Sequence, residues 1–121
     1  MNLKDIIKLD DKGLIVAVVQ HYQTGQVLMV GYMNMESLAI TLRDKKACFW
    51  SRSRQKLWIK GETSGNVLHV KEIRTDCDAD ALVIQCDPVG PTCHTNETSC
   101  FYRLVGPDGE ITLAGDGIAK E

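Results

Sequence analysis

The chain has 121 residues, of which 44% are hydrophobic and 25% charged, and we expect residues 1–121 to form one globular domain. Fourteen Lys and Arg residues against sixteen Asp and Glu residues give a net charge of -2. This balance excludes a global positive field for coating nucleic acid or an anionic membrane. Five cysteines are many for this length, and they could serve as disulfides, metal ligands or small core residues.

The N-terminal residues alternate charged and apolar side chains and lack the continuous apolar core of a signal peptide. The longest apolar run, residues 14–19, is far shorter than the roughly 20 residues needed to cross a bilayer. We therefore expect a cytoplasmic protein with reduced thiols. The odd number of cysteines also disfavours a closed set of disulfides.

The segments that predict secondary structure are mostly short and rich in β-branched residues. Residues 14–20 and 26–32 predict a hairpin, and residues 34–46 predict a helix with Asn34 as its N-cap. The pattern as a whole indicates a mainly β (α+β) fold, with a small, curled antiparallel β-sheet or pseudo-barrel and one helix. Further strands are predicted at residues 47–52, 56–60, 67–74, 81–86, 100–105 and 111–114.

Alternating aspartates surround a cysteine in the run DCDAD, residues 76–80. In an extended segment the three carboxylates would share one face and Cys77 would point to the other. Carboxylates suit Mg²⁺ and a thiolate suits zinc. A solvated acidic turn is an equally good interpretation of this run when it is taken alone.

A second cluster, CDPVGPTCHT at residues 86–95, forms a loop constrained by two prolines and a glycine. Zinc takes four protein ligands in a structural site and three in a catalytic one. Cys86 ends an apolar run and Cys48 precedes two aromatic residues, so we expect both to pack in the core. The possible zinc ligands are Cys77, Cys86, Cys93, His94 and Cys100, of which the better set is the polar or loop cysteines Cys77, Cys93 and Cys100.

A third cluster combines cations with aromatic residues in WSRSRQKLWIK, residues 50–60, followed by GETSGN, residues 61–66. Arginines beside an aromatic face, with hydroxyls and free backbone N–H groups nearby, suit a nucleotide-like anion. The alternatives are an ordinary exposed hairpin and a surface for single-stranded nucleic acid. The acidic balance of the whole chain disfavours the nucleic-acid surface.

Taken in order, the runs WSRSRQKLWIKGETSGN, DCDAD and CDPVGPTCHT followed by SCFYR resemble the phosphoribosyl-AMP cyclohydrolase family. The similarity extends from about Val27 to Arg103. It implies hydrolysis of the N1–C6 bond of the adenine ring in 1-(5-phosphoribosyl)-AMP. The product would be a formimino aminoimidazole carboxamide ribonucleotide, ProFAR, in the third step of histidine biosynthesis.

The resemblance also implies cofactors and a partner. The family members are zinc enzymes that need Mg²⁺ and work as homodimers, with zinc ligands from both subunits. Carried over by position, the zinc ligands are Cys77, Cys93 and Cys100, and the Mg²⁺ ligands are Asp76, Asp78 and Asp80.

For the chemistry, zinc with an open coordination position can activate water for attack on C6. Three thiolates blunt the acidity of the metal, so we expect a catalytic base, and His94 beside Cys93 is the candidate. His94 would accept a proton from water or pass one to the leaving N1. Mg²⁺ would orient a substrate phosphate, and the further candidates for substrate contacts are Arg52, Arg54, Lys60 and Ser64.

Two other classes of protein use similar residues. A nucleobase deaminase also attacks a ring carbon with zinc-activated water, but its H-x-E and P-C-x-x-C signature is missing here. A non-catalytic zinc module would need a closed site, with His94 or Cys86 as the fourth ligand. Conversion of phosphoribosyl-AMP would distinguish a cyclohydrolase from both.

Overall fold

The computed structural model describes residues 1–114, which contain two helices and eight strands. This arrangement confirms the mainly β prediction and adds one short helix to the one that the sequence predicts. The helices are α1 (Leu3–Ile6) and α2 (Met35–Asp44). The strands are β1 (Ile15–His21), β2 (Val27–Met33), β3 (Cys48–Ser51), β4 (Lys56–Ile59), β5 (Leu68–Thr75), β6 (Ala81–Pro88), β7 (Arg103–Val105) and β8 (Ile111–Leu113).

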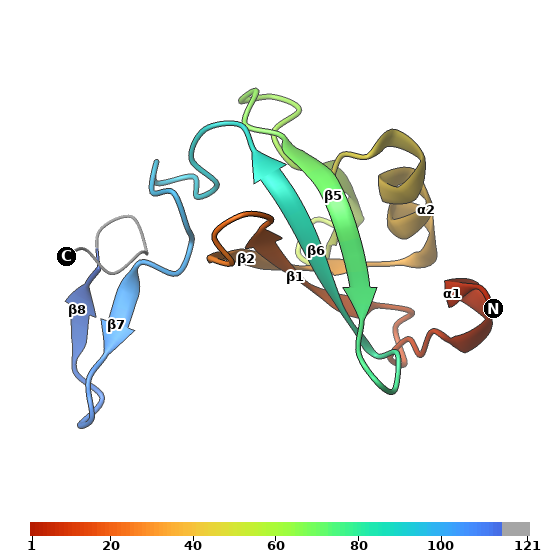
Figure 1. Ribbon diagram of the computed structural model, residues 1–121, viewed down its shortest axis with the longest axis horizontal. Helices are drawn as coiled ribbons and strands as arrows, with labels where there is room; N and C mark the ends of the chain where they lie inside the picture. The colour runs from red at the N-terminus through yellow and green to blue at the C-terminus, as the bar shows by residue number, and fades with distance from the viewer. Residues whose placement is uncertain (115–121) are drawn as a thin grey trace.

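A four-stranded sheet in the order β2-β1-β6-β5 forms the centre of the molecule (Figure 1). The pair β1–β2 is antiparallel, as the predicted hairpin requires, and β5–β6 is antiparallel too. Strands β1 and β6 pair in parallel, so the expectation of an antiparallel sheet is wrong for this pair. A parallel pair needs a long connection, which here runs through β2, α2, the β3–β4 hairpin and β5. Register shifts at Val19/Gln20 and at Val70/Glu72 mark bulges, which bend and twist the strands.

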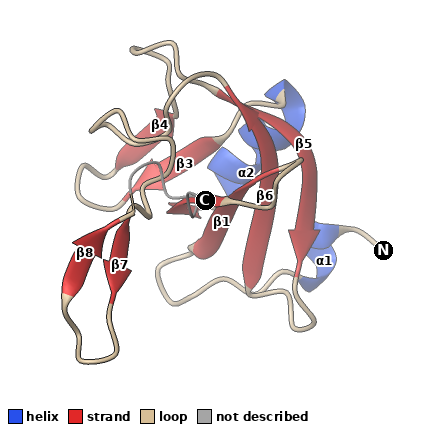
Figure 2. Ribbon diagram, turned by 60° about the vertical axis from the view of Figure 1, so that its left-hand side comes forward, coloured by secondary structure: helices blue, strands red, loops and turns tan. Residues whose placement is uncertain are grey.

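One face of this sheet carries the hydrophobic core. Every second residue of β1 and β6 is buried. Two of these residues, Val19 and Ile84, belong to one core cluster with Leu38 of α2 and Phe49 of β3. Figure 2 shows α2 behind strands β5 and β6. The opposite face of β1 and β6 is only half-buried.

Helix α2 begins at a reciprocal cap. The Asn34 side chain accepts a hydrogen bond from the Ser37 backbone N–H at 2.8 Å, and the Ser37 hydroxyl accepts one from the Asn34 N–H at 2.9 Å. The buried hydroxyl of Thr41 accepts a hydrogen bond from the Cys48 N–H at 3.0 Å. The helix is therefore tied directly to the first residue of β3.

A close contact with β2 holds the β3–β4 hairpin in position. A Cβ atom at Gly31 would lie 2.7 Å from Cδ1 of the Phe49 ring, which is closer than side-chain carbons approach. Gly31 thus leaves the space in which Phe49 packs, and Phe49 in turn contacts Trp58 with ring centroids 5.5 Å apart. This contact fixes the position of the hairpin that carries the predicted cations.

Strands β7 and β8 form a separate antiparallel hairpin that stands away from the sheet (Figures 1 and 2). All six of its strand residues are exposed. Neither helix in residues 1–114 has the length and apolar character that a membrane crossing requires.

Candidate functional site

Three carboxylates gather in the turn between β5 and β6. Ligand oxygens of Asp76, Asp78 and Asp80 lie within 4.8 Å of one another. Of the two structures considered for this run, the extended segment is wrong and the turn is found. Ala79 has a φ of 59°, and the Asp76 carboxylate accepts backbone hydrogen bonds from Asp80 at 3.0 Å and Ala81 at 3.2 Å. Convergence of the carboxylates follows from this turn and not from strand alternation.

The three aspartates are exposed and interact strongly with one another. Hydrogen bonding and charge repulsion from Asp76 and Asp78 raise the pKa of Asp80 above its ordinary value. A cation among the three oxygens would relieve this repulsion, and an all-oxygen donor set is of the kind that Mg²⁺ takes.

Two of the three predicted zinc ligands meet in the loop after β6. The backbone of residues 92–98 folds back on itself, with hydrogen bonds from Thr92 N to Thr98 O at 3.2 Å and from Cys93 N to Glu97 O at 3.1 Å. The end of the loop is fastened to β2, since the Cys100 N–H donates to the Leu28 carbonyl at 2.7 Å. This arrangement brings the sulfur of Cys100 within hydrogen-bonding reach of Cys93.

The two thiols have different proton affinities. Burial raises the pKa of Cys93, but hydrogen bonds from the side chain and backbone of Thr95 and from Cys100 outweigh it and hold that pKa below its ordinary value. Desolvation and the neighbouring Cys93 sulfur raise the pKa of Cys100 to about 11. The positive charge of Lys60 lowers both pKa values. The pair is therefore suited to hold a single proton between a thiolate and a thiol, and to bind a thiophilic metal.

Cys77 does not join this pair within one chain. It lies in the turn before β6, whereas Cys93 and Cys100 lie in the loop after it. The eight residues of β6 separate the two ends by about 25 Å, at 3.3 Å per residue. Among residues 1–114, a ligand cluster of three or more Cys, His, Asp or Glu residues forms only at the aspartates of the turn.

The remaining cysteines are packed in the interior. Cys48 and Cys86 have no exposed surface, and burial raises the pKa of both thiols, that of Cys86 to about 12. Their placement agrees with the packing role that the sequence predicts.

The loop that carries Cys93 also presents two other polar residues. His94 is exposed, directly beside the buried Cys93. Thr92 is 2% exposed, and its hydroxyl has no hydrogen-bond partner within residues 1–114. A buried hydroxyl without a partner is costly, so this atom is available to a group from outside the described residues.

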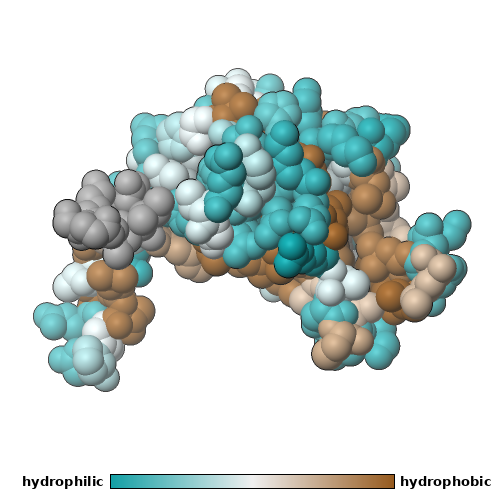
Figure 3. All heavy atoms as spheres, viewed as in Figure 1, coloured by the Kyte–Doolittle hydropathy of each residue, from teal (hydrophilic) through white to brown (hydrophobic). Residues whose placement is uncertain are grey.

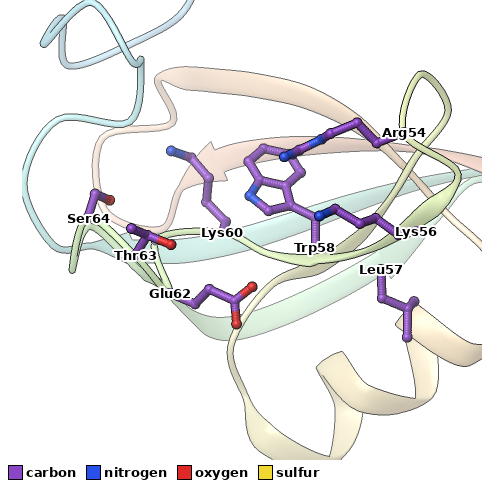
Figure 4. A pocket seen from close by; sticks show the side chains of 9 residues that line it. Arg54, Lys56, Leu57, Trp58, Lys60, Glu62, Thr63 and Ser64 are labelled. Carbon is purple, nitrogen blue, oxygen red and sulfur yellow. The ribbon is translucent and has the colours of Figure 1, made fainter.

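The β3–β4 hairpin and the loop after it line a cavity of about 310 Å³. Figure 4 shows Arg54, Lys56 and Lys60 around the indole of Trp58, with Thr63 and Ser64 on the facing loop. Strand alternation explains this grouping, because Lys56, Trp58 and Lys60 are spaced two residues apart.

Arg52 lies on the other side of the same hairpin, in the turn between β3 and β4. Its guanidinium carbon is 3.9 Å from the centre of the Tyr32 ring. The sequence prediction of Arg52, Arg54, Lys60 and Ser64 thus falls on a cationic surface with cavities. It missed Lys56, which strand alternation could have indicated, and Tyr32 and Thr95, which depend on tertiary contacts.

The chain is similar to proteins of one family. The sequence pattern of the family "Phosphoribosyl-AMP cyclohydrolase" matches residues 29–102. A phosphoribosyl-AMP cyclohydrolase of Chlorobium phaeovibrioides is 53% identical over 109 residues, which cover 90% of this chain and 80% of the relative. Those of Chloroherpeton thalassium and Rhizorhabdus wittichii are each 54% identical, over 89% and 84% of this chain and 77% and 82% of the relative.

The matched residues 29–102 include the acidic turn, the thiol pair and the cationic hairpin. With this site and these relatives, the protein is an enzyme of the hydrolase class. It belongs to the phosphoribosyl-AMP cyclohydrolase family. The alternatives of a nucleobase deaminase and of a non-catalytic zinc module are thereby set aside.

Proposed function

We propose that this protein hydrolyses the N1–C6 bond of 1-(5-phosphoribosyl)-AMP to ProFAR, the third step of histidine biosynthesis, in the cytoplasm. The observation that carries the proposal is the Cys93–Cys100 pair, which lies within the residues matched to the family and within electrostatic range of Lys60. A metal-binding thiol pair beside a cationic cavity suits the hydrolysis of a phosphorylated nucleotide.

Zinc would be held by Cys93 and Cys100 together with Cys77, and Mg²⁺ by Asp76, Asp78 and Asp80. The donor chemistry supports both assignments: sulfur for the thiophilic metal and oxygen for the hard cation. Bound zinc would supply the Lewis acidity that makes water a nucleophile at neutral pH.

A homodimer would complete the thiol site, with the third sulfur from a second copy of the chain. The separation of Cys77 from the thiol pair by the length of β6 favours this arrangement. Apolar surface suitable for a partner is also present: Figure 3 shows it on the β7–β8 hairpin and beneath the body of the molecule. Side chains exposed on the hairpin are Leu104, Val105, Ile111 and Leu113.

His94 would handle the protons of the reaction. Water adds to C6, the C6–N1 bond breaks, and one proton must move from the water oxygen to N1. The imidazole of His94 is exposed beside Cys93, and histidine is the side chain that most often serves as general acid and base in catalysis. Arg52, Arg54, Lys60 and Ser64 would bind and orient the phosphorylated arms of the substrate.

The test is to incubate the purified protein, supplied with zinc and Mg²⁺, with phosphoribosyl-AMP and to follow the ultraviolet spectrum as the purine ring opens. Ring opening without release of ammonia is expected. Ammonia release would instead indicate a deaminase, and a protein that binds zinc and Mg²⁺ but leaves the substrate unchanged would contradict the proposal. The single-domain organisation over residues 1–121 stays a prediction, since residues 115–121 lie outside the described residues.

A further inference from the structure

Two cavities adjoin each other at the β3–β4 hairpin. The smaller, of about 310 Å³, lies towards the loop of residues 60–64, and the larger, of about 590 Å³, lies towards β2. Both are lined by Arg54 and Trp58. These two side chains therefore form a common wall, with one cavity on each side.

Each cavity concentrates positive charge in a chain whose net charge is -2. The larger cavity is lined by Lys12, Arg52 and Arg54 and by no acidic residue. The smaller is lined by Arg54, Lys56 and Lys60 and by one carboxylate, that of Glu62. In the part of the chain that the structure describes, the ion pairs are Arg43–Asp44 and Arg74–Glu72, so none of these cations is paired.

One acidic side chain lies close to the larger cavity. This is Asp10, whose carboxylate is hydrogen-bonded within its own loop and lies in electrostatic range of Lys12 and Arg52. It accepts hydrogen bonds from the backbone N–H groups of Lys12 and Leu14, both at 2.9 Å. Asp10 therefore reduces the positive potential of this region without neutralising Arg52 by contact.

Arg52 is held in place before any ligand binds. Its guanidinium lies 3.9 Å from the Tyr32 ring centre, and the turn that carries it is closed by hydrogen bonds from Gln55 Nε2 to Arg52 O at 2.7 Å and from Gln55 N to Ser51 O at 2.8 Å. A guanidinium stacked on a ring keeps its N–H groups directed outward in the plane of the fork, which suits bidentate binding of phosphate.

The substrate has a matching shape. Phosphoribosyl-AMP carries one phosphoribosyl arm on N9 and another on N1, at opposite edges of the purine, so one cavity cannot take both phosphates. The common wall offers an aromatic surface, Trp58, on which a purine can stack.

We infer that the two cavities are two separate phosphate subsites, one for each arm of the substrate. The larger, with Lys12 and Arg52, takes the AMP phosphate on the N9 side. The smaller, with Lys56 and Lys60, takes the phosphate of the N1 arm, because Lys60 also lies in range of the thiol pair and N1 is bonded to the carbon under attack. This inference rests on the proposed function and adds Lys12, Tyr32 and Lys56 to the binding residues.

AMP tests the assignment, because it has the N9 arm and lacks the N1 arm. Binding of AMP to the metal-loaded protein is measured by calorimetry. Replacement of Lys12 or Arg52 by Gln should weaken AMP binding about tenfold or more, as expected for a lost hydrogen bond to a charged group. Arg52→Lys, which keeps the charge but not the fork, should restore only part of the affinity.

Lys56→Gln should leave AMP binding within about twofold of the wild type and raise the KM for phosphoribosyl-AMP about tenfold. The matched control is Lys71→Gln. Lys71 lies over the Tyr22 ring at 5.4 Å, as Arg52 lies over that of Tyr32, but it lines neither cavity. This variant should change neither measurement. All four replaced residues are exposed, and thermal unfolding checks that each variant folds.

The outcomes separate the subsites from the proposed function. If the wild type converts phosphoribosyl-AMP while Lys12→Gln and Arg52→Gln bind AMP as tightly as the wild type does, the two subsites are overturned and the proposed function stands. If Lys56→Gln weakens AMP binding as much as Lys12→Gln does, the assignment of one cavity to each arm of the substrate is overturned. A wild type that fails to convert phosphoribosyl-AMP overturns the proposed function on which both rest.

Discussion

The hydroxyl of Thr95 donates a hydrogen bond to the Sγ atom of Cys93 at a distance of 3.0 Å. This contact stabilises the thiolate form of Cys93, and it helps to hold the pKa of that thiol below its ordinary value although burial raises it. A residue two positions along the same loop thus favours the thiolate of Cys93, which is the form that the proposed zinc would bind.

Thr95→Val should weaken zinc binding by about ten- to a hundredfold, the usual effect of losing a residue that supports a ligand. The isosteric side chain keeps the shape of the loop but cannot donate to Cys93. Competition with a chromophoric chelator measures the affinity. The matched control is Thr24→Val in the exposed turn between β1 and β2, where the hydroxyl likewise makes a local hydrogen bond, with the Gln26 N–H; this variant should bind zinc like the wild type. Equal affinities for all three proteins would show that the hydrogen bond has no part in metal binding.

His94→Ala should lower kcat by about a hundredfold or more while zinc remains bound, because the proton from water would lose its acceptor. Zinc content measured on the same sample separates loss of catalysis from loss of metal. Unchanged turnover would remove His94 from the mechanism. Loss of zinc in this variant would instead make His94 a ligand.

Gly31→Ala should destabilise the fold by about 1–3 kcal/mol, since the new methyl group would lie 2.7 Å from the Phe49 ring and force it to move. Urea unfolding measures the change. Gly106→Ala is the control: its added Cβ would meet nothing closer than 3.4 Å, and we expect a change within about 0.5 kcal/mol. Equal stabilities of wild type and Gly31→Ala would mean that Phe49 does not require this space.

The buried thiol of Cys86 predicts a loss of stability at alkaline pH. Its pKa is about 12 in the folded protein, against an ordinary 9.0, so the folded state holds the proton more tightly than the unfolded chain. The contribution of this thiol to the free energy of unfolding is therefore complete below pH 9 and falls as the pH rises towards 12. At pH 10.5 it has fallen by roughly 2 kcal/mol. Urea unfolding from pH 7 to 10.5 should show a shallower decline for Cys86→Ala, and parallel declines would contradict the assigned pKa.

The local structure could largely be predicted from the sequence. β-Branched residues in alternation located the strands from residue 15 to residue 88 within a residue or two, and Asn34 marked the start of α2. Strand order could not be predicted, because the parallel pairing of β1 with β6 joins residues that are far apart in the sequence, such as Val16 and Ala81, and no local pattern encodes it.

Residue type alone was enough to nominate the aspartates and the cysteines as candidate ligands, and the structure brings together the three aspartates and the pair Cys93 and Cys100. The geometry of the site was not predictable. The acidic run turns at Ala79 because of a positive φ that alanine rarely adopts, and Lys12 reaches the hairpin cavity from a distant loop. Cys77 and Cys93 are near in sequence, yet β6 holds them apart.

The most direct test of the shared site mixes two inactive variants, Cys77→Ser and Cys93→Ser, by unfolding and refolding them together. If each site takes Cys77 from one chain and Cys93 with Cys100 from the other, half of the dimers are mixed, and each mixed dimer has one complete site of two. The mixture should then convert phosphoribosyl-AMP at about one quarter of the wild-type rate. A mixture as inactive as its two components, beside a refolded wild type that is active, would contradict a site shared between two chains.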